Sequence, residues 1–300
     1  LAFVINKRIM KRKSSHVLTK SVVFFIVFLT LNLGLKAQED TYWIGLSFKN
    51  PAAIATPSDW AYADYSRIVY GSTSEYTNLF VGSFDYKISQ KAGTIGLDLS
   101  YQKYNIESTL LIKANYAYDI QVFETSMLSF GVSAGTTFYK NNISEYGIYD
   151  PVDPNYIPPA DIKYNFLNGN AGVFLHSPRL STGLSLTFER LMNGGDGYTM
   201  PSVLTGVLAY RIVNNDVLVI TPNFMVDYVS EHFSSVPGLQ LKYKNAWAGY
   251  QNLDFEDFHS INLGVDVKTK FRIGYSYGFD DFFSTDGLST HEFVLGYRLQ

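Results

Sequence analysis

The chain has 300 residues, of which 46% are hydrophobic, 16% aromatic and 17% charged, and its formal net charge is −3. It contains no cysteine, which excludes disulfides, thiolate metal sites and a cysteine nucleophile. Its 23 Tyr and 22 Phe are an unusual number for a chain of this length. A length of 300 residues is compatible with one large domain or two ordinary ones.

Residues 1–37 differ in composition from the rest of the chain. Six basic residues precede the apolar run Ser21–Leu33, and Ala37 lies directly before Gln38. A positive segment, an apolar core and a small residue in this order predict a cleaved secretory signal peptide over residues 1–37. The alternative is a single transmembrane anchor, for which the apolar run is short compared with the ~20 residues of a membrane-spanning helix.

Removal of the leader changes the charge of the chain. Residues 1–37 hold seven basic and no acidic residues, so 17 of the 24 Lys and Arg remain against 27 Asp and Glu, a net charge of −10. A strongly acidic exported protein is a poor partner for nucleic acid. We therefore expect no nucleic-acid partner.

Strict alternation of apolar and polar residues recurs along the rest of the chain. In the stretch 260–281, Ile261, Leu263 and Val265 alternate with polar or small residues such as Asn262 and Asp266. This pattern predicts strands whose two faces meet different surroundings. The sequence predicts about fourteen antiparallel strands, at 60–70, 78–88, 94–104, 109–121, 127–140, 165–176, 180–190, 201–213, 217–230, 236–243, 246–253, 260–268, 271–279 and 290–299.

The connections between these strands alternate in length. Brief turns such as Ser177–Arg179 fall on one side, and longer acidic segments such as 141–164 fall on the other. Short turns at one rim and long loops at the other are typical of outer-membrane β-barrels with periplasmic termini. We therefore predict an all-β transmembrane outer-membrane barrel over residues 60–300, preceded by a periplasmic N-terminal segment over residues 38–59.

In this fold the apolar face of each strand meets lipid and the polar face lines the lumen. Fourteen tilted strands imply a radius on the order of 14 Å, so the lumen has to contain water, in-folded loops or the N-terminal segment. The alternative is a secreted soluble β-sandwich or a small lipocalin-sized barrel, in which the apolar face forms a dry core. The many Tyr and Phe near strand ends favour the membrane barrel, because they match interfacial aromatic girdles.

Several stretches after the leader carry motifs of one known protein family. The segment "QEDTYWIGLSFKNPAAIA" resembles the beginning of family members, with Asn50, Pro51 and Ala52 at the Asn-Pro-Ala motif. Near the end of the chain, Gly274, Tyr275 and Tyr277 match a G-Y-S-Y-D motif, although Gly278 stands where the family carries Asp. The pair His291 and Glu292 matches a G-x-H-E motif. In these stretches the chain resembles the PorP/SprF family of type IX secretion system outer-membrane proteins, and the resemblance covers nearly the whole chain after the leader.

The resemblance implies a function. It implies a non-enzymatic outer-membrane component that supports secretion or surface attachment of large adhesins and gliding-type machinery. The implied partners are the secretion ring, a peptidoglycan-binding protein, the C-terminal domain of a surface adhesin and outer-membrane lipid. The alternative hypothesis is a FadL-like transporter for hydrophobic small molecules, with the N-terminal segment as a hatch.

The sequence offers little sign of catalysis or cofactor binding. The histidines form no spaced pair typical of a zinc site, and no G-x-S-x-G motif is present. We therefore expect no enzyme activity and no cofactor. Acidic loops at Asp150, Asp153, Asp280 and Asp281 are weak candidates for Ca²⁺ ligands, since exposed acidic loops are more often simply solvated. Glu292 is expected to face the interior and to pair with a basic residue of the wall.

Overall fold

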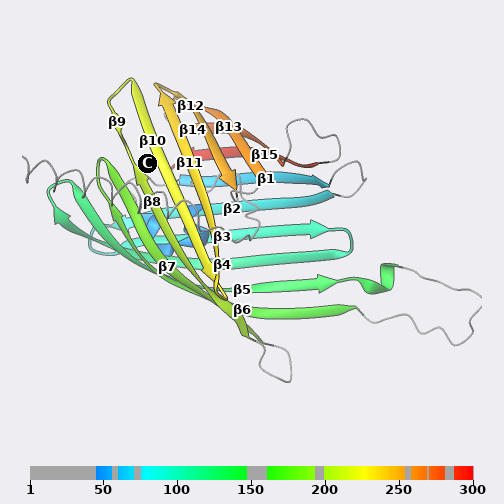
Figure 1. Ribbon diagram of the computed structural model, residues 1–300. Helices are drawn as coiled ribbons and strands as arrows, with labels where there is room; N and C mark the ends of the chain where they lie inside the picture. Colours follow the sequence, from blue (N-terminus) through cyan, green and yellow to red (C-terminus); the bar gives the residue numbers. More distant parts are fainter. Residues whose placement is uncertain are drawn as a thin grey trace, which may run out of the picture.

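The computed structural model describes residues 45–55, 60–70, 76–146, 161–192, 199–253, 258–268, 270–280 and 287–299. Within these ranges, fourteen antiparallel strands form one closed sheet, and a two-residue strand, β9, extends a turn at one rim. Figure 1 shows the strands curving around a common interior. The predicted all-β barrel of about fourteen strands is confirmed. The predicted signal peptide lies outside the described residues.

The strand bounds follow the predicted ones closely. They are β1 (Trp60–Tyr70), β2 (Tyr76–Ser89), β3 (Gly93–Tyr104), β4 (Glu107–Phe123), β5 (Ser126–Asn141), β6 (Ile162–His176), β7 (Leu180–Leu191), β8 (Thr199–Tyr210), β9 (Val213–Asn214), β10 (Leu218–Val229), β11 (His232–Tyr243), β12 (Ala246–Leu253), β13 (Phe258–Val267), β14 (Phe271–Phe279) and β15 (Leu288–Arg298). The largest difference is β11, which begins four residues before the predicted 236.

The first and last strands close the ring. Strand β1 pairs with β15 over its whole length, from Trp60 opposite Arg298 to Tyr70 opposite Leu288. Because the two strands are antiparallel, β1 begins and β15 ends at the rim that carries the short turns. Every described strand longer than two residues has a partner on each side, so the backbone polar groups of the wall are satisfied without a free edge, as a lipid environment requires.

The apolar side chains of the wall point away from the lumen. On β13, Ile261, Leu263 and Val265 are 40%, 55% and 40% exposed, whereas the alternating Asn262 is 1% exposed. The prediction that the apolar face of this ribbon points outward is therefore confirmed. A soluble sandwich would have buried the same three side chains between two sheets.

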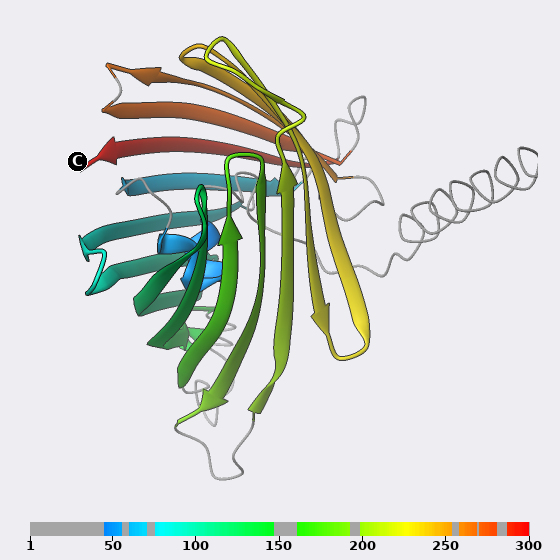
Figure 2. The same cartoon turned by 90° about the vertical axis from the view of Figure 1, so that its left-hand side faces the viewer.

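Helical structure in the described residues is limited to three short pieces. Helix α2 (Leu46–Lys49) and the 3-10 turn η1 (Pro51–Ala55) precede the barrel, and η2 (Ile143–Tyr146) follows β5. None of the helices described is long and apolar enough to span a membrane. Figure 2 shows α2 and η1, drawn in blue, inside the ring of strands.

Candidate functional site: a plug in the barrel lumen

Residues 45–55, called here the luminal plug, lie against the inner surface of the barrel (Figure 2). The plug is tightly enclosed, since Asn50 is 1% exposed and Ala52 is not exposed at all. Residues 38–59 are predicted from the sequence to form a periplasmic segment before the barrel, and the structure places residues 45–55 of this segment in the lumen. Of the three candidates for the content of the lumen, the structure therefore shows the N-terminal segment.

The Asn-Pro-Ala motif sets the local shape of the plug. The amide of Asn50 donates to Leu46 O at 2.8 Å and ends α2. Pro51 starts η1 at a position where its missing N–H is not required. The Asn50 Oδ1 atom accepts the amide of Ala52 at 3.0 Å, and the carbonyl of Asn50 accepts the amide of Ala53 at 3.0 Å. The motif therefore joins two short helical turns at a sharp bend.

Two glycines of the wall make room for this bend. A Cβ atom at Gly131 of β5 would lie 2.2 Å from Ala52 N, and one at Gly172 of β6 would lie 2.2 Å from Asn50 Oδ1. Real Cβ atoms essentially never come within 3.0 Å of such an atom, so glycine allows the backbone of the plug to touch the wall at Gly131 and the Asn50 side chain to touch it at Gly172. The plug and the wall are thus in direct main-chain contact.

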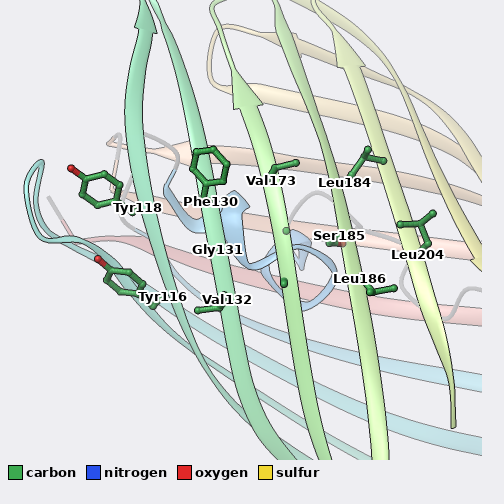
Figure 3. A pocket seen from close by; sticks show the side chains of 12 residues that line it. Tyr116, Tyr118, Phe130, Gly131, Val132, Val173, Leu184, Ser185, Leu186 and Leu204 are labelled. Atoms are coloured by element: carbon green, nitrogen blue, oxygen red, sulfur yellow. The ribbon is translucent and has the colours of Figure 1, made fainter. Parts of the chain in front are cut away.

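Figure 3 shows the opposite face of this part of the wall, with α2 and η1 behind the strands. Apolar side chains such as Phe130, Val173 and Leu184 point outward and line a groove of about 600 Å³. Gly131 and Gly172 line the same groove. At these two glycines only the main chain of the strand separates the outer groove from the plug.

The side chain of Asn50 anchors the plug to two neighbouring strands. Its Nδ2 atom donates to Val173 O on β6 at 3.1 Å and to Leu184 O on β7 at 3.3 Å. Together with the bond from Ala52, all hydrogen-bonding atoms of this amide are used. Asparagine supplies two donors and an acceptor on one short side chain, which aspartate or leucine would not.

A buried ion pair on β3 and β4 holds helix α2. The Lys113 Nζ atom lies 3.5 Å from Asp98 Oδ2 and donates to Phe48 O at 2.9 Å. The other oxygen of Asp98 accepts the hydroxyl of Ser47 at 2.8 Å, and Asn115 donates to Asp98 Oδ2 at 2.7 Å. A cation at the C-terminal carbonyls of a helix is favourable. Lys113 therefore stabilises both the carboxylate and the helix end.

Lys49 connects the plug to strands β6, β7 and β10. Its carbonyl accepts hydrogen bonds of 2.7 Å from Asn170 on β6 and from Ser185 on β7. Its ammonium lies 3.3 Å from Asp227 on β10, whose other oxygen accepts the hydroxyl of Thr205 on β8. The plug is therefore held by side chains from β3 to β10, about half of the ring.

A second charged group lies on the inner face of the remaining strands. Asp266 of β13 binds Arg272 of β14 through two contacts of 2.7 and 3.1 Å, and it accepts from Lys242 of β11 at 2.7 Å. Lys242 and Arg272 also line a cavity of about 210 Å³ together with Arg211 and Trp247. The lumen is thus polar and charged on both sides.

The C-terminal motif residues lie on β14 and β15, and their side chains divide between the two faces. The Tyr275 hydroxyl is 2.7 Å from His291 Nδ1, and the Tyr277 ring lies 5.2 Å from the His291 ring. Glu292 is 2% exposed and is paired in register with the small residues Ser66 and Ser276.

Gly274, the remaining motif residue on β14, faces the lumen. The indole of Trp247 covers it, so that an added Cβ would lie 2.5 Å from the ring. The contacts of Asn50, Pro51 and Ala52 described above are with β5, β6 and β7. The two sets of motif residues therefore occupy different parts of the barrel.

One of the four calcium candidates can be described. Asp280 Oδ2 accepts the amide of Leu288 at 2.7 Å and so closes the base of the last loop, while Asp150, Asp153 and Asp281 lie outside the described residues. Where the chain is described, no three His, Asp or Glu side chains are grouped as metal ligands would be. Calcium binding stays a prediction.

Sequence reasoning did not single out the polar side chains that hold the plug. Asp98 and Lys113 are directly opposite in register on β3 and β4, and both lie at mid-strand on the polar face. Ionisable residues within membrane-spanning segments indicate functional or structural sites. The mid-strand position of Asp98 and Lys113 could be recognised in the sequence. Their contacts with Ser47 and Phe48 of the plug could not.

Comparison with known families supports the resemblance drawn from the sequence. The family described as type IX secretion system membrane protein PorP/SprF matches residues 50–297. This range begins at Asn50, the first residue of the Asn-Pro-Ala motif, and includes all of β1 to β14. No curated protein matches the sequence.

Solved structures share the fold at low sequence identity. The chain is similar to a deltaS2 mutant of the monoaromatic hydrocarbon channel TodX, with a TM-score of 0.52 and 12% identity over 83% of this chain and 92% of that chain. The toluene transporter TodX of Pseudomonas putida gives a TM-score of 0.50 at 10% identity, covering 89% and 95% of the two chains. A FadL homologue of Pseudomonas aeruginosa gives 0.50 at 12% identity, covering 85% and 94%. At such identities these similarities show a common fold alone.

Proposed function

Because the chain belongs to the PorP/SprF family of type IX secretion system membrane proteins, we propose that it is a non-enzymatic component of that system which supports secretion or surface attachment of large adhesins. Family membership and the closed barrel imply an outer-membrane location. Gliding-type machinery is a further process that this role would serve.

The observation that carries this proposal is the anchored plug. Hydrogen bonds and an ion pair from side chains and carbonyls of β3, β4, β6, β7 and β10 hold residues 47–50 in place. A barrel with its lumen occupied in this way works through its rims and its luminal segment rather than as an open pore. Such surfaces suit a protein that binds other components of a secretion apparatus.

The topology supports an arrangement of partners at the two rims. Strand β1 begins and β15 ends at the short-turn rim, so both termini of the barrel face the periplasm in the usual orientation of such barrels. In this arrangement the secretion ring and a peptidoglycan-binding protein contact the short-turn rim. The longer loops face the cell surface and the C-terminal domain of the adhesin.

The direct test is affinity purification of the tagged full-length protein from detergent extracts of its own membranes. We expect secretion-ring or adhesin components to co-purify. A matched variant with Asn50→Leu, which removes both bonds to the wall, separates a role of the plug from a role of the rims. Recovery of no secretion-ring or adhesin component from the wild-type barrel would contradict the proposal.

The alternative is transport of hydrophobic small molecules, which is supported by the barrel fold shared with TodX and the FadL homologue and in which the plug would act as a hatch. The polar lumen opposes it, because Asp98 and Lys113 lie in the wall beside the plug and are buried. A deletion strain distinguishes the two functions. Loss of hydrocarbon or fatty-acid uptake with normal adhesin secretion would favour transport, and the reverse would favour the secretion role.

A further inference from the structure

The outer surface of the barrel carries a row of basic side chains at the long-loop end of β3 to β6. Lys103 on β3 is opposite Ser108 on β4, Ser108 is opposite Lys140 on β5, and Lys140 is opposite Lys163 on β6. We call these three lysines, with Ser108 between them, the basic rung. The row continues on the other side of Lys103 through Asn78 to Arg67.

The lysines of the basic rung face away from the lumen. Along each strand they follow the outward positions of Tyr101 and Phe138, which are 42% and 43% exposed. Lys103 and Lys163 are themselves exposed and Lys140 is half-buried. The rung is therefore presented to the surroundings of the barrel and not to the plug.

In the described part of the chain, no carboxylate forms an ion pair with a lysine of the basic rung. Within the part of the chain that the structure describes, none of the three lysines takes part in an ion pair or a hydrogen bond. Asp161 lies two residues before Lys163, and its carboxylate accepts a hydrogen bond of 2.7 Å from the Ser144 hydroxyl. That hydrogen bond, with a smaller effect of Lys140 and Lys163, lowers the pKa of Asp161.

Two like charges directly opposite on neighbouring strands destabilise a sheet. Lys140 and Lys163 form such a pair, in a protein whose charge after the predicted leader is strongly negative. A cationic pair on the outer surface at this position can bind an anion from the surroundings of the barrel.

The depth of the rung indicates where that anion lies. On β5 the outward residues from Leu128 to Phe138 are apolar or small. Leu128 and Phe138, the two ends of this apolar stretch, are ten residues apart in the sequence. At ~3.3 Å per residue and a tilt near 40°, this corresponds to about 25 Å, the height of the apolar band of outer-membrane barrels. Lys140 is the next outward residue, so it lies where the hydrocarbon ends and the headgroups begin.

Strand tilt offsets the lysines in depth by about 3 Å per strand. Lys140 and Lys163 are adjacent and thus nearly level, and Lys103 lies two strands from Lys140. Flexible lysine side chains can cover this offset by reaching along the surface. At the opposite rim the outward side chains of β4, β14 and β15 remain apolar to the turns, as Val122, Phe271 and Tyr297 show.

We propose that the basic rung binds phosphate groups of lipid headgroups in the membrane leaflet on the long-loop side of the barrel. Ammonium groups attract phosphate as compact charges with several donors. Ser108, between Lys103 and Lys140, adds a neutral hydroxyl donor to the same row. This inference requires that the barrel spans a membrane and does not depend on the secretion role.

The test compares lipid retention by full-length protein reconstituted in phosphatidylcholine vesicles that contain lipid A with its phosphates or dephosphorylated lipid A. After transfer to detergent, native mass spectrometry counts the lipid A molecules that remain on each barrel. We expect the wild type to retain phosphorylated lipid A. A variant with Lys103→Gln, Lys140→Gln and Lys163→Gln should retain at least about 10-fold fewer molecules of phosphorylated lipid A.

A matched control carries Lys91→Gln, Lys244→Gln and Lys270→Gln, three exposed lysines of the short turns. It has the same net charge as the first variant and should retain lipid A like the wild type. Heat-modifiable gel mobility shows that both variants are folded. Equal retention by all three proteins, or equal retention of dephosphorylated lipid A, would overturn the proposal. Loss of lipid A on addition of inorganic phosphate alone would assign the rung to free phosphate and also overturn it.

Discussion

Substitution of Gly131 by alanine is the sharpest perturbation of the plug. The added Cβ would lie 2.2 Å from Ala52 N and 2.4 Å from Pro51 C, whereas ordinary contact begins at 3.4 Å. The plug therefore has to move by more than about 1 Å. The two bonds of Asn50 to the wall, at 3.1 and 3.3 Å, do not survive such a shift. At 0.5–1.5 kcal/mol for each, the docked plug loses about 1–3 kcal/mol, or about 5- to 150-fold in its docking equilibrium.

The absence of cysteine from the chain allows this shift to be measured directly. A single Ala53→Cys substitution places a thiol on the plug at a position that is 7% exposed, so maleimide reacts with it only when the plug leaves its site. We expect Gly131→Ala to increase the labelling rate of Cys at this position by about 10-fold or more. The measurement is made on folded protein in detergent or vesicles.

Gly82→Ala provides the matched control. This glycine also lies in the wall, but an added Cβ meets only Phe80 at 3.7 Å and Tyr62 O at 3.8 Å, so labelling should stay at the parent rate. Equal labelling rates in Gly131→Ala and its parent would refute the reasoning that direct main-chain contact holds the plug.

Three further outcomes are expected. Lys113→Met leaves the fully buried Asp98 without its ammonium and should cost about 3–5 kcal/mol, seen as a lower temperature of heat-modified gel mobility that Asp98→Asn partly restores. Asp266→Asn should lower the same temperature by less, because the Lys242 side chain is 39% exposed and solvent screens its charge. Leu263→Lys places a cation on the outward face of β13 and should reduce the free energy of unfolding from vesicles by about 2–4 kcal/mol, measured by urea titration.

The fold could be predicted because the two faces of the wall differ so clearly. Ile261, Leu263 and Val265 alternate with polar residues, and the structure exposes the first set and buries the second. The prediction was less accurate at β11, where Ser234, Ser235 and Val236 are buried in succession. Val236 belongs to a buried apolar cluster with Val207 and Met225, against which Leu46 of the plug packs. The alternation of buried and exposed residues is lost there, so a two-residue period could not identify the start of the strand.

The plug could be predicted only as one of several contents of the lumen. The resemblance identified Asn50, Pro51 and Ala52 as motif residues, but the partners of Asn50 on β6 and β7 lie more than 120 residues away. In the sequence, Gly131 and Gly172 look like any other small residue on a luminal face. Their role depends on the approach of a distant backbone, which no local pattern contains.

The closed ring has a consequence for biogenesis. The plug precedes β1 in the chain, yet it is fastened to strands as far along as β10, and the seam between β1 and β15 joins the two ends of the sheet. While that seam is open, the leading segment can settle onto the curved sheet from the side. Once it is sealed, the same segment can enter only by threading through a mouth, so we expect the order of docking and sealing to govern the yield of mature protein.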